Sequence, residues 1–405
     1  MTDSIFEKQL KQQLATLGQV PSLTEAQTTQ GVKVLNALKS AMGNDTWSFE
    51  RLMGFALYEP GLGYYAAGST KFGLSGDFTT APEISPLFSG AVARQCAQIL
   101  QELNGGEILE VGAGSGKMAV DIMLELERIE QLPERYCILE ISADLQERQQ
   151  QQIQACAPHL FKKFVWMTQW PSEAIEGIIL GNELIDAIPC QLMKIQNGEP
   201  VEVGVSWSAG GELMQTPMAS ASQETQKWYQ RRRDQRARLP EGYLTEVHVQ
   251  AWAWLQTAAK VLQQGAIVLI DYGFPDQEYY HEQRDQGTLM CHYRHHAHAN
   301  PLILLGLQDI TTHVDFTELA EVADKAGLHV AGFCTQMSFL MAMQVTQHAE
   351  RLMQTDPEKA INLSQGLKKI LMPQEMGELF KCIAFTKNIT QPLEGFMLQD
   401  MRARL

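Results

Sequence analysis

The chain has 405 residues, of which 45% are hydrophobic and 20% charged, a composition typical of a soluble globular protein with two or three structural units. Its net charge of -15 disfavours nonspecific binding to nucleic acid or to an anionic membrane, so neither is expected as a partner. The seven cysteines are scattered and include no Cys-x-x-Cys pair, which disfavours a disulfide framework and a thiolate zinc site.

The first residues, MTDSIFEKQLKQQ, lack the apolar segment of a secretory signal, and their acidic residues are unlike those of an organellar transit peptide. No apolar run approaches the roughly 20 residues needed to cross a bilayer. We therefore expect a cytoplasmic protein. The sequence leaves the oligomeric state open, with a homodimer as one option.

Residues 1–105 are predicted to form a mostly helical N-terminal region. Ser22 followed by Glu25 is the pattern of a capping box and predicts that a helix begins there. Residues 58–85 are rich in glycine, proline and aromatic residues, which predicts a long loop. Residues 85–103 return to helical spacing.

From residue 107 onward, strands and helices alternate, which predicts an α/β fold with a mostly parallel sheet covered by helices on both faces. The predicted strands are EILEV (107–111), RYCILEIS (135–142), KFVWMT (163–168), GIILGN (177–182), AIVLIDYG (266–273), HVAGFCTQ (329–336) and KCIAFTK (381–387). We assign residues 106–405 to one Rossmann-like domain with insertions at about 191–262 and 274–314. The first insertion opens with an Asn-Gly turn between two β-like runs, which predicts a hairpin.

The segment EILEVGAGSGK places three glycines between a strand and a helix: Gly112, Gly114 and Gly116. Glycines there allow a tight turn and let a ligand approach the backbone, while the helix N-terminus faces anions. A Walker A loop would need Gly in place of Val111 and Ser or Thr in place of Met118, and a dinucleotide fingerprint would need a small residue in place of Lys117. A plain tight turn without a ligand remains an alternative.

The pattern is instead an acid, one residue and GxGxG, with Glu110 as the acid. It resembles motif I of class I S-adenosylmethionine-dependent methyltransferases. In that family the loop wraps the methionine end of the cofactor, and the acid lies near its ammonium group. Glu140 ends the second strand, where a carboxylate can accept both ribose hydroxyls of an adenosine ligand. NAD sites share that feature, so Glu140 supports adenosine without choosing between the cofactors.

Together with the glycine loop, four further stretches resemble the MidA family of these methyltransferases: GDFTTAPEIS (76–85), NELIDAIP (182–189), LIDYG (269–273) and the run from GTLMCHYRHHAH to TELA (287–320). The likeness extends from about residue 48 to residue 330. Mitochondrial members of the family support respiratory complex I assembly by methylating an arginine of a complex I subunit. The resemblance therefore implies that residues 106–405 are the catalytic domain, that S-adenosylmethionine is the cofactor and that the acceptor is an arginine of a protein partner.

The resemblance also places the loop 58–85 over the cofactor as a lid, with Asp77, Thr79, Pro82 and Glu83 of its segment 76–85 as contacts. From the residues alone, a helix is expected to begin near Pro82. An Asx-type turn that caps the helix 85–103 explains the same segment, and the two interpretations are compatible.

The fourth predicted strand ends in Asn182, Glu183 and Asp186, and ligands bind outside the carboxyl ends of such strands. We therefore expect Asn182 and Glu183 beside the sulfonium or the acceptor nitrogen. A guanidinium is planar and always protonated, so it needs a carboxylate clamp, with Glu183 as the first choice and Asp186 as the second. Asp271 and Tyr272, which end the fifth strand, are expected to complete an acidic acceptor pocket. A helix N-terminal charge is the alternative for Asp186.

The string HYRHHAH contains four histidines: His292, His295, His296 and His298. No carboxylate lies at a familiar metal-site spacing, so no metal is expected. We assign His292 to the acceptor side, with a structural loop as the alternative. The arginines of RRRDQRAR (231–238) are expected to form a solvated basic face, with a site for an acidic partner as the alternative.

Two other functions stay open at this point. One is a non-catalytic assembly factor that binds S-adenosylmethionine and grips a client protein, and the other is a nicotinamide oxidoreductase. The sequence shows no nucleophile–base pair, which suits methyl transfer because positioning supplies most of the catalysis of an in-line displacement.

Overall fold

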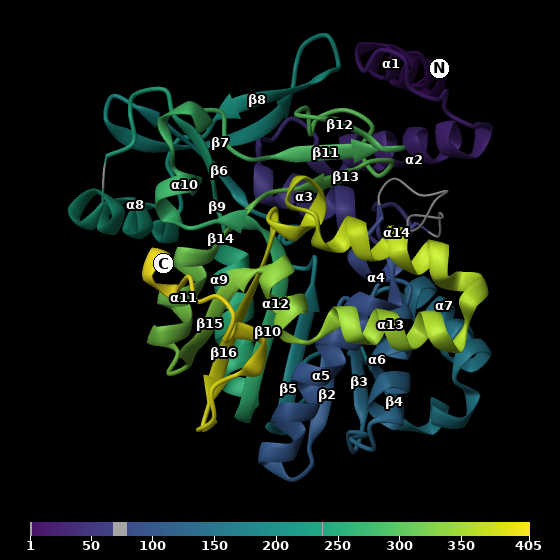
Figure 1. Ribbon diagram of the computed structural model, residues 1–405. Helices are drawn as coiled ribbons and strands as arrows, with labels where there is room; N and C mark the ends of the chain where they lie inside the picture. The colour runs from purple at the N-terminus through teal and green to yellow at the C-terminus, as the bar shows by residue number, and fades with distance from the viewer. Residues whose placement is uncertain (1, 68–78, 237) are drawn as a thin grey trace.

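The computed structural model describes residues 2–67, 79–236 and 238–405, and an eight-stranded sheet forms its centre (Figure 1). The strand order is β15-β16-β10-β5-β2-β3-β4, with β14 paired to the end of β10. The strands span Glu107–Val111 (β2), Tyr136–Leu139 (β3), Phe164–Met167 (β4), Ile175–Asn182 (β5), Leu262–Phe274 (β10), Val314–Asp315 (β14), His329–Thr335 (β15) and Phe380–Lys387 (β16). Strands β4, β3, β2, β5 and β10 are parallel, while β16 is antiparallel to both of its neighbours. The predicted α/β fold is confirmed.

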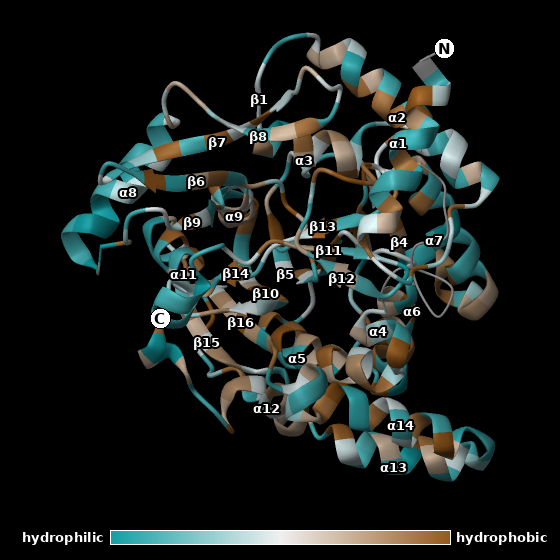
Figure 2. Ribbon diagram, turned by 90° about the horizontal axis from the view of Figure 1, so that it is seen from above, coloured by the Kyte–Doolittle hydropathy of each residue, from teal (hydrophilic) through white to brown (hydrophobic). Residues whose placement is uncertain are grey.

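Alternate residues of the strands pack into two separate cores, one on each face of the sheet. Ile108 and Ile178 belong to one core, and their neighbours Leu109 and Ile179 belong to the other. The first core is covered by α5 (Pro86–Leu103), α6 (Lys117–Arg128), α7 (Ala143–Cys156), α12 (Gln336–Ala342), α13 (Val345–Thr355) and α14 (Ala360–Leu371). The second is covered by α9 (Val249–Val261) and α11 (Phe316–Lys325). Figure 2 shows both hydrophobic and hydrophilic stretches along α13 and α14, as expected for helices that cover a core.

Two smaller sheets and the N-terminal helices lie at the top of the molecule in Figure 1. The larger of them is antiparallel and joins β1 (Trp47–Ser48), β7 (Glu199–Trp207), β6 (Gln191–Gln196) and β9 (Leu244–Val247) in that order, with β8 (Leu213–Pro217) on β7. The other contains β11 (Met290–Tyr293), β12 (His296–His298) and β13 (Asp309–Thr311). The N-terminal helices are α1 (Thr2–Thr16), α2 (Glu25–Met42) and α3 (Phe49–Tyr58). Three further helices of the chain are α4 (Ala81–Ile84), α8 (Gln223–Gln235) and α10 (Asp276–Tyr279). Asn197 and Gly198 form the turn between β6 and β7 with positive φ of 54° and 77°, which confirms the predicted hairpin.

The capping box predicted near the start of α2 forms from other residues than Ser22 and Glu25. Thr24, and not Ser22, is the N-cap of α2, and the third helical residue is Gln27, and not Glu25. The Thr24 hydroxyl accepts from the Gln27 N–H at 3.2 Å, and the Gln27 side chain accepts from the Thr24 N–H at 3.0 Å. The sequence SLTEAQ contains two overlapping capping-box patterns, Ser22–Glu25 and Thr24–Gln27. The second one forms, and it satisfies the backbone N–H groups of both of its residues.

The helices that flank the predicted domain boundaries pack with the main sheet. Helix α5 lies within residues 1–105, yet it buries most of one face in the first core. Helix α9 lies within the range 191–262, yet it packs in the second core. Helices α1–α3 and α8 pack instead with the two smaller sheets, in cores separate from those of the main sheet.

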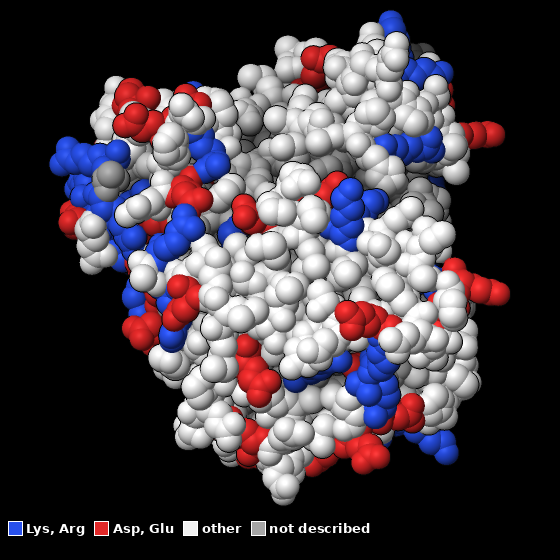
Figure 3. Space-filling model, viewed as in Figure 1, with Lys and Arg blue, Asp and Glu red and all other residues white. Residues whose placement is uncertain are grey.

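The arginine run on α8 does not form the solvated face that we expected. Arg231 pairs with Glu318, Arg232 pairs with Asp276, and Arg236 pairs with Glu321 at 2.8 Å. Figure 3 shows basic side chains gathered at the upper left, where α8 lies, with acidic side chains among them. The run therefore fastens α8 to α10 and α11.

All seven cysteines are free, and six of them are buried. In the part of the chain that the structure describes, no helix is both long and apolar enough to span a lipid bilayer.

Candidate functional site

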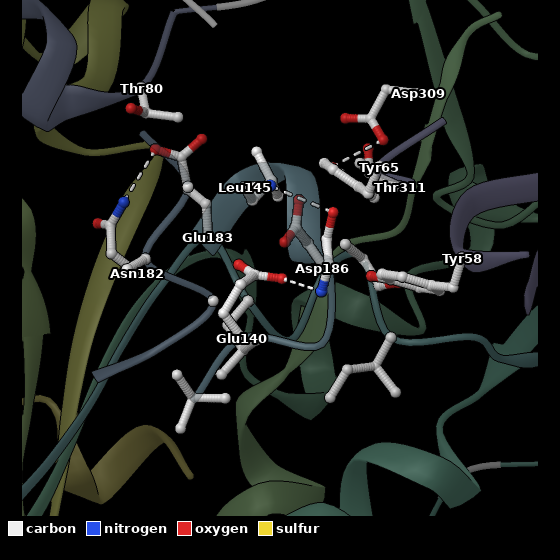
Figure 4. A pocket seen from close by; sticks show the side chains of 18 of the residues that line it. Tyr58, Tyr65, Thr80, Glu140, Leu145, Asn182, Glu183, Asp186, Asp309 and Thr311 are labelled. Atoms are coloured by element: carbon white, nitrogen blue, oxygen red, sulfur yellow. Dashed lines mark hydrogen bonds between the residues drawn. The ribbon is translucent and has the colours of Figure 1, made fainter. Parts of the chain in front are cut away.

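A cavity of about 1020 Å³ lies at the carboxyl ends of the parallel strands. The chain runs from β2 outward to β3 and β4, and then continues on the other side of β2 with β5 and β10. The loops that follow β2 and β5 therefore diverge and leave a crevice, which is where ligands bind in such sheets. Figure 4 shows the side chains that face this crevice.

The glycine loop forms one wall of the cavity. Gly112, Gly114 and Gly116 have φ of 70°, 54° and 80°, a region that other residues rarely adopt. Gly112 and Gly114 line the cavity, whereas Gly116 caps α6 and lies against α7. A Cβ atom at Gly116 would stand 3.2 Å from the Cα of Gln149, so the loop needs glycine for both conformation and packing.

Two carboxyl groups, those of Glu110 and Glu140, line the cavity beside this loop. The Tyr136 hydroxyl donates to Glu110 Oε2 at 2.7 Å, and burial raises the pKa of Glu110 to about 7. Glu140 accepts from the Ser142 N–H at 2.9 Å and from Gln149 Nε2 at 3.3 Å. Gln149 Nε2 also donates to the Gly114 carbonyl at 3.0 Å, so this buried glutamine holds the acid and the loop together.

A tight turn follows β5 and carries the predicted catalytic residues. Glu183 adopts a φ of 49°, and its N–H donates to the Ile270 carbonyl at 2.9 Å. Asp271 Oδ2 accepts from the backbone N–H groups of residues 184–186 at 3.2, 2.9 and 3.3 Å. Asp271 therefore holds the turn from behind and does not line the cavity, in contrast to its expected place in the acceptor pocket.

Asn182, Glu183, Asp186 and Tyr272 do line the cavity, and they form two hydrogen-bonded pairs. Asn182 Nδ2 donates to Glu183 Oε1 at 3.3 Å, and the Tyr272 hydroxyl donates to Asp186 Oδ2 at 2.6 Å. Asn182 Oδ1 and Asp186 Oδ1 are buried without a hydrogen-bond partner. Leaving such an atom unpaired costs about 1–3 kcal/mol, so both are positioned to accept from a ligand.

The environment raises the pKa of both carboxyl groups of this turn, Glu183 and Asp186. Burial raises the pKa of Glu183 to about 8, and the nearby charge of Asp186 adds to that effect. Burial also raises the pKa of Asp186 to about 6, against the opposing effect of the Tyr272 hydrogen bond. A bound cation would reverse this effect and favour the ionised forms of both groups.

The charged residues of the wall all have the same sign. Among the described residues, seven carboxyl groups line the cavity and no lysine or arginine does: the acids are Glu83, Glu110, Glu140, Asp144, Glu183, Asp186 and Asp309. Such a wall attracts cations, because field lines are focused inside a low-dielectric cleft. The arrangement suits a sulfonium, an ammonium or a guanidinium group.

The remaining predicted residues are placed as follows. Thr79, Pro82, Glu83 and His292 line the cavity, whereas Asp77 lies outside the described residues. The Ser115 hydroxyl donates to Glu83, so the glycine loop contacts α4. Within the described ranges, no group of three or more His, Cys, Asp or Glu residues is arranged to hold a metal ion.

The structure adds wall residues that the sequence did not single out: Tyr58, Tyr65, Trp170, Trp254, Asp309, Thr311 and His313. Tyr58 and Tyr65 belong to the aromatic segment 58–85, whose composition was the only signal of their role. Asp309 is a single carboxylate in the apolar run PLILLGLQDI, which is unusual enough to have marked it.

Residues 91–334 match a family model described as "Putative S-adenosyl-L-methionine-dependent methyltransferase". A solved structure from Burkholderia thailandensis, described as a methyl transferase candidate and bound to S-adenosyl-homocysteine, is 37% identical, with a TM-score of 0.89 over 95% of this chain and 100% of that chain. The chain is also similar to the mitochondrial protein arginine methyltransferase NDUFAF7 of Danio rerio and to its homolog in Drosophila melanogaster. The Drosophila melanogaster protein is 27% identical over 81% of this chain and 78% of its own length, and the Danio rerio protein is 25% identical over 86% and 88%.

These findings confirm the resemblance read from the motifs, and they agree with the cavity described above. The family model covers more than half of the chain and includes the glycine loop, Glu140 and the turn after β5. The chain belongs to the family of S-adenosyl-L-methionine-dependent methyltransferases.

Proposed function

We propose that this methyltransferase modifies an arginine side chain of a protein partner. The observation that carries the proposal is the wall of seven carboxyl groups without a lysine or arginine among its described residues. S-adenosylmethionine brings a sulfonium and an ammonium, and a guanidinium acceptor brings one more positive charge. The similarity to proteins named protein arginine methyltransferases supports the same acceptor.

The cofactor would occupy the side of the cavity built by the strands. Glu140 would accept from the ribose hydroxyls, while the glycine loop and Glu110 would face the methionine end. Asn182 Oδ1, buried and unpaired, is an acceptor for the ammonium group. Thr79, Pro82 and Glu83 would cover the ligand from α4 and the residues before it, and Asp77 stays a prediction for the same lid.

The acceptor would bind next to the turn after β5. Glu183 and Asp186 would hold the guanidinium, and the unpaired Asp186 Oδ1 offers a place for one of its N–H groups. S-adenosylmethionine, when bound, supplies an electrophilic methyl group on sulfur. The guanidinium nitrogen would gain the methyl carbon and lose a proton, and the sulfur would keep the electron pair of the broken bond. Glu183 or Asp186 would take up that proton.

We also propose a cytoplasmic location for the chain and a protein substrate, whose identity the sequence leaves open. The word mitochondrial in the names of the similar proteins describes the location of those proteins and not of this chain. The absence of nucleic-acid or membrane partners stays a prediction from the net charge, and a homodimer stays one option for the oligomeric state.

The test is methyl transfer from labelled S-adenosylmethionine to arginine-containing peptides and to the same peptides with lysine, with methylated residues identified by mass spectrometry. We expect methylarginine with the wild-type chain and less than about one hundredth of that rate with Glu183→Gln. Glu176→Gln, at an exposed position on the same strand, is the matched control. Cofactor binding without any transfer to arginine, together with full biological activity of Glu183→Gln, would favour a non-catalytic assembly factor instead.

A further inference from the structure

The two ends of the cavity are built by different parts of the chain. The segments after β2, β3, β4 and β5 form the end that suits the cofactor, and they belong to the main sheet. The other end is lined by residues of α3, of the segment that follows it and of the small sheet β11–β13. In Figure 4, Tyr58, Tyr65, Asp309 and Thr311 lie on one side, Asn182, Glu183 and Thr80 lie on the other, and Asp186 lies between them.

Asp309 is a buried carboxylate held in place at this second end. It lies on β13 and is only 2% exposed. Its Oδ1 accepts from the Tyr65 hydroxyl at 3.0 Å and from the Ile310 N–H at 3.0 Å. Burying a carboxyl group is costly without such partners. The Asp309 carboxyl group is therefore held at a fixed place beside the cavity.

Asp309 is also tied to the turn that carries Asp186. The Asp186 carbonyl accepts from the Thr312 N–H at 3.0 Å, and Thr312 follows β13 directly. Asp186 is 4% exposed, and its Oδ1 has no hydrogen-bond partner. Two carboxyl groups from different parts of the sequence are thus held at fixed positions on the wall of the same cavity.

Two tyrosines complete this end. The rings of Tyr58 and Tyr65 are stacked, with centroids 5.5 Å apart and planes at 20°. The Tyr58 hydroxyl donates to the Ala187 carbonyl at 2.9 Å, while the Tyr65 hydroxyl donates to Asp309, so both rings are fixed. Aromatic faces attract cations, and a planar guanidinium stacks on them better than an ammonium does. We call Tyr58, Tyr65, Asp186 and Asp309 the acceptor seat.

We propose that Asp309, oriented by Tyr65, is the specificity-determining residue that selects a guanidinium over an ammonium at the acceptor seat. The proposal rests on the proposed function, because it assigns the seat to the acceptor arginine. A guanidinium offers N–H groups in several directions of one plane, so it can pair with Asp186 and Asp309 together and still stack on a tyrosine. A lysine ammonium lacks the plane and cannot fill the seat in this way.

The experiment compares the wild-type chain with Asp309→Asn and Tyr65→Phe, and uses Asp324→Asn, at an exposed position on α11, as the control. Methyl transfer is measured with an arginine peptide and its lysine counterpart, and S-adenosylmethionine affinity is measured by calorimetry. We expect both seat variants to raise the KM for the arginine peptide roughly 10- to 100-fold, as for the loss of a charged hydrogen bond, with cofactor affinity unchanged within about twofold. The preference for arginine over lysine should fall by a similar factor.

A binding measurement separates failure of this proposal from failure of the proposed function. The arginine peptide is titrated into the chain saturated with S-adenosyl-homocysteine, so no turnover is required. Asp309-dependent binding without methyl transfer would reject the proposed function and keep the seat. Methyl transfer to arginine with unchanged KM and selectivity in Asp309→Asn and Tyr65→Phe would overturn the seat. Tyr65→Phe removes one hydroxyl only, which keeps the test valid if Asp309→Asn does not fold.

Discussion

Glu183→Gln should stabilise the chain in the absence of ligands, and the gain should grow with pH. The folded chain raises the pKa of Glu183 from 4.5 to about 8. Between these pH values the folded chain binds more protons at this site than the unfolded chain does, so the site lowers stability as the pH rises. Glutamine is neutral at every pH and has nearly the same shape, so it removes this cost.

The magnitude follows from about 1.4 kcal/mol for each pKa unit. Full burial would give a gain of about 3 kcal/mol at pH 7 and about 1 kcal/mol at pH 5. Because part of the Glu183 side chain is open to the cavity, we expect about half of these values after solvent screening. A gain of about 1.5 kcal/mol corresponds to roughly 2 °C in Tm for a chain of this size.

The assay is denaturant unfolding of wild-type, Glu183→Gln and the exposed control Glu176→Gln at pH 5, 6 and 7.5. The difference between wild-type and Glu183→Gln should increase at each step, while the control should follow wild-type. A Glu183→Gln variant that is no more stable than wild-type at pH 7.5, or whose gain is the same at every pH, would refute the reasoning about burial.

Three further predictions concern the cofactor, the acceptor and the ion pairs that join α8 to α10 and α11. Glu140→Gln should weaken S-adenosylmethionine binding roughly 10- to 100-fold in calorimetry, because it removes a charged acceptor for the ribose hydroxyls. Glu147→Gln, at an exposed position, is the control and should bind the cofactor as wild-type does. Equal affinities of wild-type and Glu140→Gln would show that Glu140 does not contact the cofactor. The KM for an arginine peptide should fall as the pH rises from 6 to 8, because Asp186 and Glu183 ionise with pKa values of about 6 and about 8; a flat KM would contradict this. Arg232→Ala should lower the unfolding free energy by about 3 kcal/mol, because it removes the nearer of the two arginines that pair with the buried Asp276 and leaves only Arg236, at 3.5 Å. A loss below about 1 kcal/mol would contradict that.

The sequence predicted the geometry of the glycine loop and the strands around it well, for a physical reason. Motifs such as the glycine loop and the acid at the end of β3 lie on contiguous segments, where strand, turn and helix follow one another, so local patterns determine their geometry. The parallel strands were readable because both faces are buried and each strand is a nearly continuous apolar run.

The opposite wall of the cavity depends on contacts between residues far apart in sequence. Tyr65 and Asp309 form a hydrogen bond although 244 positions separate them, and neither belongs to a local motif. Gln149 is one of four successive glutamines, and only the fold shows that this one is buried against Gly114 and Glu140. Asp271 lies three residues before the end of its strand, and its oxygens accept from backbone N–H groups, which no pattern in the sequence indicates.

The central claim is that the cavity binds S-adenosylmethionine through the glycine loop. Its most direct test is calorimetric titration of the purified chain with S-adenosylmethionine, with NAD as the control ligand and Gly114→Val as the control variant. Gly114 has a φ of 54°, which a β-branched residue adopts only with strain. We expect a dissociation constant near 1 μM, roughly -8 kcal/mol, that is lost in Gly114→Val and is not seen with NAD. Tighter binding of NAD, or S-adenosylmethionine binding that Gly114→Val leaves unchanged, would contradict the account.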